Sequence, residues 1–108
     1  MVSDELMRIS DDYWRDAHAE VQSQRSRIDC AFEAGYCALL SVLTNAELRG
    51  VEHPSAKLLA KAARTAGVDA VPGLAAMRKR YSPFAERQTL GELLTWAKRV
   101  REAVKMLG

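Results

Sequence analysis

The 108-residue sequence contains few residues that commonly carry covalent or metal chemistry, with only two cysteines and two histidines. His18 and His53 do not combine with Cys30 and Cys37 in the spacing of a zinc site. A glycine-rich phosphate loop and the GxSxG, HExxH and CxxC motifs are all absent. We therefore expect no cofactor and no metal, and the sequence disfavours a conventional metabolic enzyme.

Long hydrophobic runs are also missing, since no apolar stretch approaches the roughly 20 residues that span a bilayer. The first residues, MVSDELMRISDD, are acidic and polar, unlike a signal or transit peptide. Apolar residues make up 48% and charged residues 28% of the chain, a mix typical of one globular domain. We expect a single cytoplasmic domain over residues 1–108 that does not enter the membrane.

Strand and hairpin signals are absent, and the three prolines fall where a helix would begin or a loop would lie. The pattern predicts an all-α protein, a four- or five-helix, mostly antiparallel bundle. We expect the first two helices to be separated by a break within residues 22–26, and the alternative is that they form one continuous helix. The first expected helix begins at Ser3 or Ser10, and the second runs from Ser26 to Ala46. The third covers 55–66 and ends before Gly67, the fourth covers 72–81, and the last begins after Thr89.

Two of these helices show a clear buried face. In the first helix, Trp14, Ala17 and Val21 share one face. Thr89 and Glu92 form a capping-box pattern before the last helix, with Trp96 at the margin of its apolar stripe. The stripe itself consists of Leu90, Leu93, Ala97, Val100, Val104 and Leu107. Trp14, Trp96, Phe32 and Phe84 are expected to be core or interface aromatics.

The two cysteines lie seven residues apart in the second helix. A rise of about 1.5 Å per residue places them roughly 10 Å apart, too far for a disulfide within an intact helix. The helix is apolar or small nearly all round, which indicates burial on two sides. We expect one side to be a helix–helix or subunit interface formed by Cys30, Ala34, Cys37 and Ser41.

Charge is distributed unevenly along the chain. Residues 1–20 carry six acids and two bases, whereas residues 78–108 carry eight bases and three acids. One interpretation is that the two ends pack together and neutralise each other. The alternative is a nucleic-acid-binding surface made by Arg78, Lys79, Arg80, Lys98, Arg101 and Lys105.

The stretch SRIDCAFEAGYCALLSVL, followed by GVEHPSAKLLAKAA, resembles the HEPN superfamily of small all-helical domains. The residues that carry the resemblance are Arg27, Ala31, Tyr36, the ALL at 38–40 and EHPSAKLL. The resemblance covers about residues 10–66. The resemblance implies a homodimer that acts as an accessory protein. Its expected role is the antitoxin-type partner of a protein encoded nearby, in a toxin–antitoxin or nucleotidyltransferase pair.

HEPN members that cleave RNA carry an Arg followed after four to six residues by a His, both facing a dimer cleft. The nearest match is Arg49 and His53 in RGVEH, with three residues between them, across Gly50 and before Pro54. This departure favours the non-catalytic members. A ribonuclease using Arg49 and His53 remains the second hypothesis, and nucleic-acid binding by the basic set remains the third.

Overall fold

The computed structural model describes residues 2–81 and 89–108, apart from the side chains of residues 79–81. The expected all-α fold is confirmed, and the described residues contain no strand. Phe84 lies outside the described residues. Among those described, no helix is both long and apolar enough to cross a membrane. The helices are α1 (Asp4–Ala17), α2 (Gln24–Leu40), α3 (Asn45–Leu48), α4 (Ala56–Ala66), α5 (Val71–Tyr81) and α6 (Leu90–Leu107).

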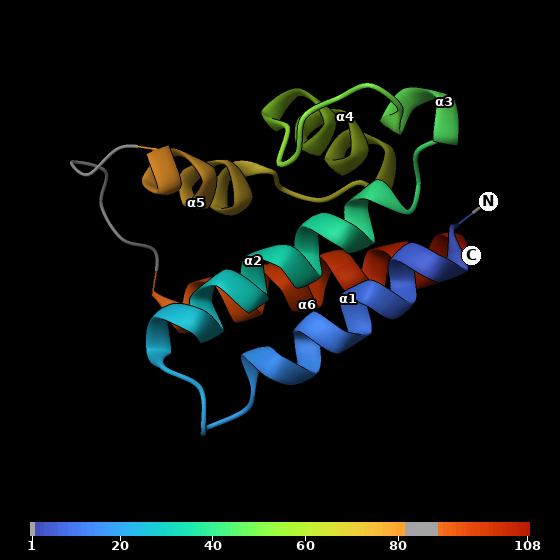
Figure 1. Ribbon diagram of the computed structural model, residues 1–108. Helices are drawn as coiled ribbons and strands as arrows, with labels where there is room; N and C mark the ends of the chain where they lie inside the picture. The colour runs from blue at the N-terminus through green and yellow to red at the C-terminus, as the bar shows by residue number, and fades with distance from the viewer. Residues whose placement is uncertain (1, 82–88) are drawn as a thin grey trace.

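Helix α2 lies at the centre of the bundle (Figure 1). Helix α1 packs antiparallel to it, whereas α6 runs in the same direction as α2 on its other side (Figure 1). Helices α3 to α5 carry the chain back, and α4 and α5 form a layer against α2 and α6. At the end of the bundle where the termini meet, the Ser3 amide donates to the Ser41 carbonyl at 2.9 Å.

The second helix ends earlier than expected, at Leu40 rather than Ala46. A separate helix, α3, begins after Thr44 because its hydroxyl accepts from the Glu47 amide while the Glu47 carboxylate accepts from the Thr44 amide. This capping box satisfies donors at a new helix N-terminus, so it stabilises a break. At its start, α2 includes Gln24, two residues before the expected Ser26, because Ser23 is the N-cap.

The first helix is separate from the second, as the break at 22–26 predicted, but it ends sooner than expected. Ser3 rather than Ser10 is the N-cap. The helix ends at Ala17, whose carbonyl accepts from the Arg27 guanidinium Nε at 2.9 Å. Val21 therefore lies outside the helix and is 94% exposed, so it does not share a helix face with Trp14 and Ala17 as expected.

The later helices agree more closely with the sequence pattern. Gly67 ends α4 with a φ of 73°, the left-handed conformation that glycine adopts without strain. Thr89 caps α6, and Leu93, Ala97, Val100 and Val104 on its stripe are fully buried. Two details differ, since Leu107 at the end of α6 is 53% exposed and Trp96 is only 4% exposed.

Trp96 is buried because two glycines make room for its indole ring. A Cβ atom added at Gly35 of α2 or at Gly73 of α5 would lie 2.8 Å from the Cη2 atom of Trp96. The ring also stacks at 6.3 Å on Phe32, which in turn stacks at 5.6 Å on Tyr36. The indole N–H donates to the Asp69 carbonyl at 2.8 Å, so one residue of α6 fixes both α2 and the α4–α5 corner.

We predict that Gly35→Ala lowers the free energy of unfolding by about 1–3 kcal/mol, because the added methyl group overlaps the indole ring. Gly91→Ala is the matched control, since nothing lies within 4 Å of its added Cβ. It should leave stability unchanged or raise it by up to about 1 kcal/mol. Urea unfolding of both variants is the measurement, and equal effects would contradict the packing argument.

Candidate functional site

The loop between α3 and α4 holds the one histidine that the sequence singled out for catalysis. His53 is exposed, but its Nδ1 lies 2.6 Å from the Tyr36 hydroxyl, which rises from α2. The two rings meet edge to face at 5.8 Å. The same hydroxyl accepts from the Ser55 backbone N–H at 2.8 Å. His53 is therefore held in one orientation by a side chain that is only 2% exposed.

The protonation of Tyr36 defines what this arrangement can do. Burial raises the pKa of its phenol above the ordinary value, although the hydrogen bond from Ser55 opposes the shift. The phenol therefore keeps its proton at neutral pH and can donate it to Nδ1. In the tautomer in which Nδ1 accepts this bond, the N–H of the ring is on Nε2, the nitrogen that does not contact Tyr36.

Arg49 lies at the end of α3 and is exposed, with its backbone N–H bonded to the Asn45 carbonyl at 3.0 Å. Tyr36, not Arg49, is the side chain that orients His53. The sequence analysis named Tyr36 only as part of the HEPN resemblance and missed its contact with His53, because the last turn of α2 and the whole of α3 lie between the two residues. Apart from that resemblance, its sequence signal was a hydroxyl-bearing ring among the apolar residues of a central helix.

Helix α3 is fixed to α4 by an ion pair between Glu47 and Lys61. The Lys61 ammonium, together with the capping bonds from Thr44, lowers the pKa of the Glu47 carboxyl to about 2. This pair holds the start of the loop that carries Arg49 and His53.

The basic set predicted for nucleic-acid binding is divided by the fold. Arg101 is only 7% exposed, and its guanidinium donates to the Ser10 hydroxyl at 2.6 Å and to the Asp11 carboxylate at 2.7 Å. It also lies 5.3 Å from the centre of the Trp14 ring. Arg78, Lys98 and Lys105 are exposed, whereas the side chains of Lys79 and Arg80 lie outside the described part of the chain.

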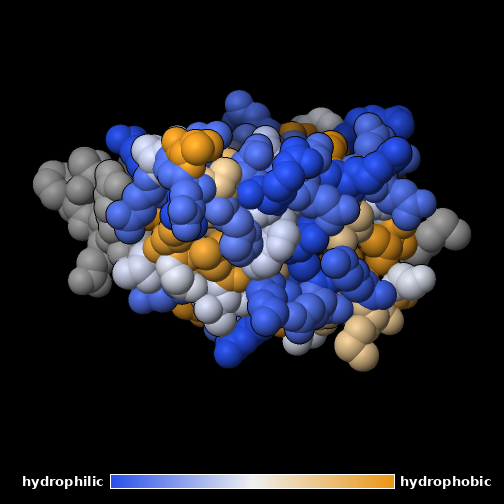
Figure 2. Space-filling model, turned by 90° about the horizontal axis from the view of Figure 1, so that it is seen from below, coloured by the Kyte–Doolittle hydropathy of each residue, from blue (hydrophilic) through white to orange (hydrophobic). Residues whose placement is uncertain are grey.

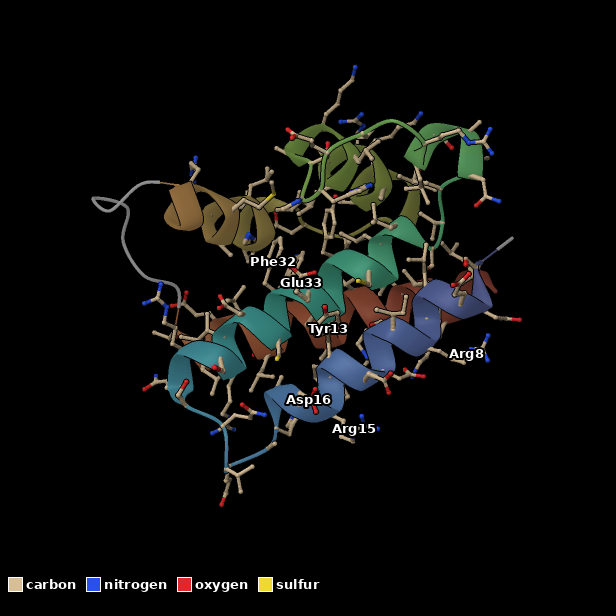
Figure 3. The ribbon with its side chains drawn as sticks, in the orientation of Figure 1. Arg8, Tyr13, Arg15, Asp16, Phe32 and Glu33 are labelled. Carbon is tan, nitrogen blue, oxygen red and sulfur yellow. The ribbon has the colours of Figure 1, made fainter. Side chains whose placement is uncertain are left out.

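Arg101 thus shows the neutralisation of one end of the chain by the other, because Asp11 belongs to the acidic segment of residues 1–20. Arg101 is thus buried with Nη1 and Nη2 bonded to α1, whereas Arg78, Lys98 and Lys105 are exposed. Figure 2 shows the face seen from the side of α1 as mainly hydrophilic, with small separate hydrophobic areas. On α1, Arg8 and Arg15 project away from α2, whereas Tyr13 lies between the two helices (Figure 3).

The predicted interface residues of α2 face α1. Ala34 and Ser41 are fully buried, and the Ser10 hydroxyl donates to the Ala34 carbonyl at 2.7 Å. Burial, followed by the nearby Glu33 carboxylate, raises the pKa of the Cys37 thiol to about 12. Burial is also the largest cause of a raised pKa for the Cys30 thiol. Ala34 therefore lies at a contact between α2 and α1, and both thiols stay protonated at neutral pH.

A groove of about 770 Å³ lies between α6 and the α4–α5 corner. The sequence analysis did not anticipate this groove, because its two walls come from segments that only the fold brings together. Trp96 lies in the lining, beside Glu92, Thr95 and Arg99 of α6 and Asp69 and Val71 of the corner.

Comparison of the chain with protein-family models, curated proteins and solved structures gave no match.

We predict that stability falls less in acid when Glu47 is replaced by Gln. The pKa of Glu47 is lower in the folded protein, so its ion pair contributes fully above pH about 5 and is lost as the pH falls towards about 2. Urea unfolding at neutral pH and near pH 3 would measure this difference. Glu52→Gln removes the same charge from an exposed site and is the control. An acid response identical to that of the wild type would refute the assignment.

Proposed function

We propose that the protein is a HEPN-like interaction module, a homodimeric accessory component without catalysis of its own. Its partner would be a toxin or nucleotidyltransferase encoded nearby, and it would act in the cytoplasm. The supporting resemblance covers about residues 10–66, which span most of α1 and the whole of α2 to α4. The observation that carries the proposal is the groove beside α6, a concave surface with charged groups and a largely exposed Val71 side chain.

The two thiols and Arg101 agree with the same proposal, because these three side chains serve packing. Burial in the fold keeps both thiols of α2 protonated, and the buried Arg101 is paired with the part-exposed Asp11 of α1. A concave surface with an exposed apolar wall is typical of a binding site. Binding is therefore the role best supported by the described residues.

We predict that multi-angle light scattering at tens of micromolar protein gives the mass of a dimer. Co-expression with the product of an adjacent toxin or nucleotidyltransferase gene should yield a complex that survives size exclusion. A monomer at that concentration, with no complex formed, would contradict the proposal.

A ribonuclease is the second candidate, and the hydrogen bond between Tyr36 and His53 favours it. A histidine with one ring nitrogen held in place and the other exposed suits general acid–base catalysis. In RNA cleavage, His53 would transfer a proton at the 2′-hydroxyl or the leaving oxygen, and Arg49 would stabilise the charge on the phosphate. Tyr36 would act through His53 as a positioning residue.

We predict for this candidate that His53→Ala lowers cleavage of a mixed RNA pool by about 10²–10⁴-fold, the range of general acid–base catalysis. Tyr36→Phe should give a smaller loss and shift the pH profile, because Nδ1 loses its partner. Circular dichroism checks that this variant folds, since the hydroxyl also binds the Ser55 amide. His18→Ala, at the other histidine, is the control. Cleavage that continues unchanged in His53→Ala would exclude the ribonuclease role.

A further inference from the structure

The groove beside α6 carries opposite charges at two ends of one helix face. Glu92 and Arg99 both line it and both are exposed, and Thr95 lies between them. A separation of seven residues corresponds to two helical turns, so the two side chains point the same way about 10 Å apart along α6. The acid lies towards the N-terminus of the helix and the base towards the middle.

This order of charges is complementary to itself. In a dimer with two-fold symmetry, the same surface is used by both copies, so residue i contacts j and j contacts i. If two α6 helices cross antiparallel near Thr95, Glu92 of each copy faces Arg99 of the other. A parallel pairing would instead place like charges opposite each other, at an energetic cost.

The wall opposite α6 is held in place before any partner arrives. The Asp69 carboxylate accepts from the Val71 amide at 2.9 Å, and its backbone carbonyl accepts from the Trp96 indole N–H at 2.8 Å. Val71 on this wall is 61% exposed. Burial of this apolar side chain would contribute to association, and the fixed wall keeps the entropic cost of binding low.

We propose that this groove is the self-association surface, occupied by a second copy of the chain with its α6 antiparallel. The proposal rests on the homodimer of the proposed function and names its interface. The side of α2 that carries Ala34 packs against α1 and is buried, so it does not compete for this role.

Charge reversal tests the interface on the full chain by sedimentation equilibrium. Glu92→Arg and Arg99→Glu each create two like-charge contacts across the two-fold axis, and each should raise the dimer dissociation constant about tenfold or more. The double variant exchanges the charges, so it should dimerise like the wild type. An equimolar mixture of the two single variants should associate more tightly than either alone, because every contact in the heterodimer then joins opposite charges.

Glu102→Arg is the matched control, because it makes the same change in net charge at an exposed α6 position outside the groove lining. Its dissociation constant should equal that of the wild type. A wild-type dimer that both single variants preserve would overturn this interface and leave the homodimer standing. A monomeric wild type would overturn the homodimer itself and the interface with it.

Discussion

The packing of Trp96 between two glycines is the constraint on which the other helices depend. Its indole ring lies where side chains at Gly35 and Gly73 would otherwise be, so α2 and α5 must both approach α6 closely. The ring stacks on Phe32 and, through it, on Tyr36, which reaches His53. The indole N–H also holds the α4–α5 corner through Asp69. One side chain therefore positions both the groove and the ring that orients the exposed histidine.

A second constraint connects the helices on the other side of α2. Arg101 brings a full charge into the bundle, and it is tolerated because Ser10, Asp11 and Trp14 of α1 surround the guanidinium. Ser10 also connects Arg101 to α2, since its hydroxyl donates to the Ala34 carbonyl. Charged groups are costly to bury without such partners. The opposite charges of the two chain ends are thus partly paired within the fold, through Arg101 and Asp11. As a result, α6 has fewer exposed bases than its sequence suggests.

Local chemistry predicted much of this fold, and long-range contacts account for most of what it missed. The cap at Thr89 and the stop at Gly67 depend on neighbouring residues, so they could be predicted from the sequence, which left the first cap open between Ser3 and Ser10. The Thr44–Glu47 capping box was equally local but was overlooked inside an apolar helical pattern. The burial of Trp96 and Arg101, the bond from Tyr36 to His53 and the groove could not be derived, because each joins distant segments.

The parallel arrangement of α2 and α6 has a consequence for the order in which the chain can fold. Helices α1 and α2 are neighbours in sequence, so their hairpin closes a short loop at low entropic cost. The pairing of α2 with α6 must wait for a crossing that includes α3, α4 and α5. Phe32 and Leu39 on α2 are nearly or fully buried in the finished bundle. During synthesis on the ribosome, α6 emerges after α2 to α5, so the part of the α2 face that α6 covers stays open until α6 has been made.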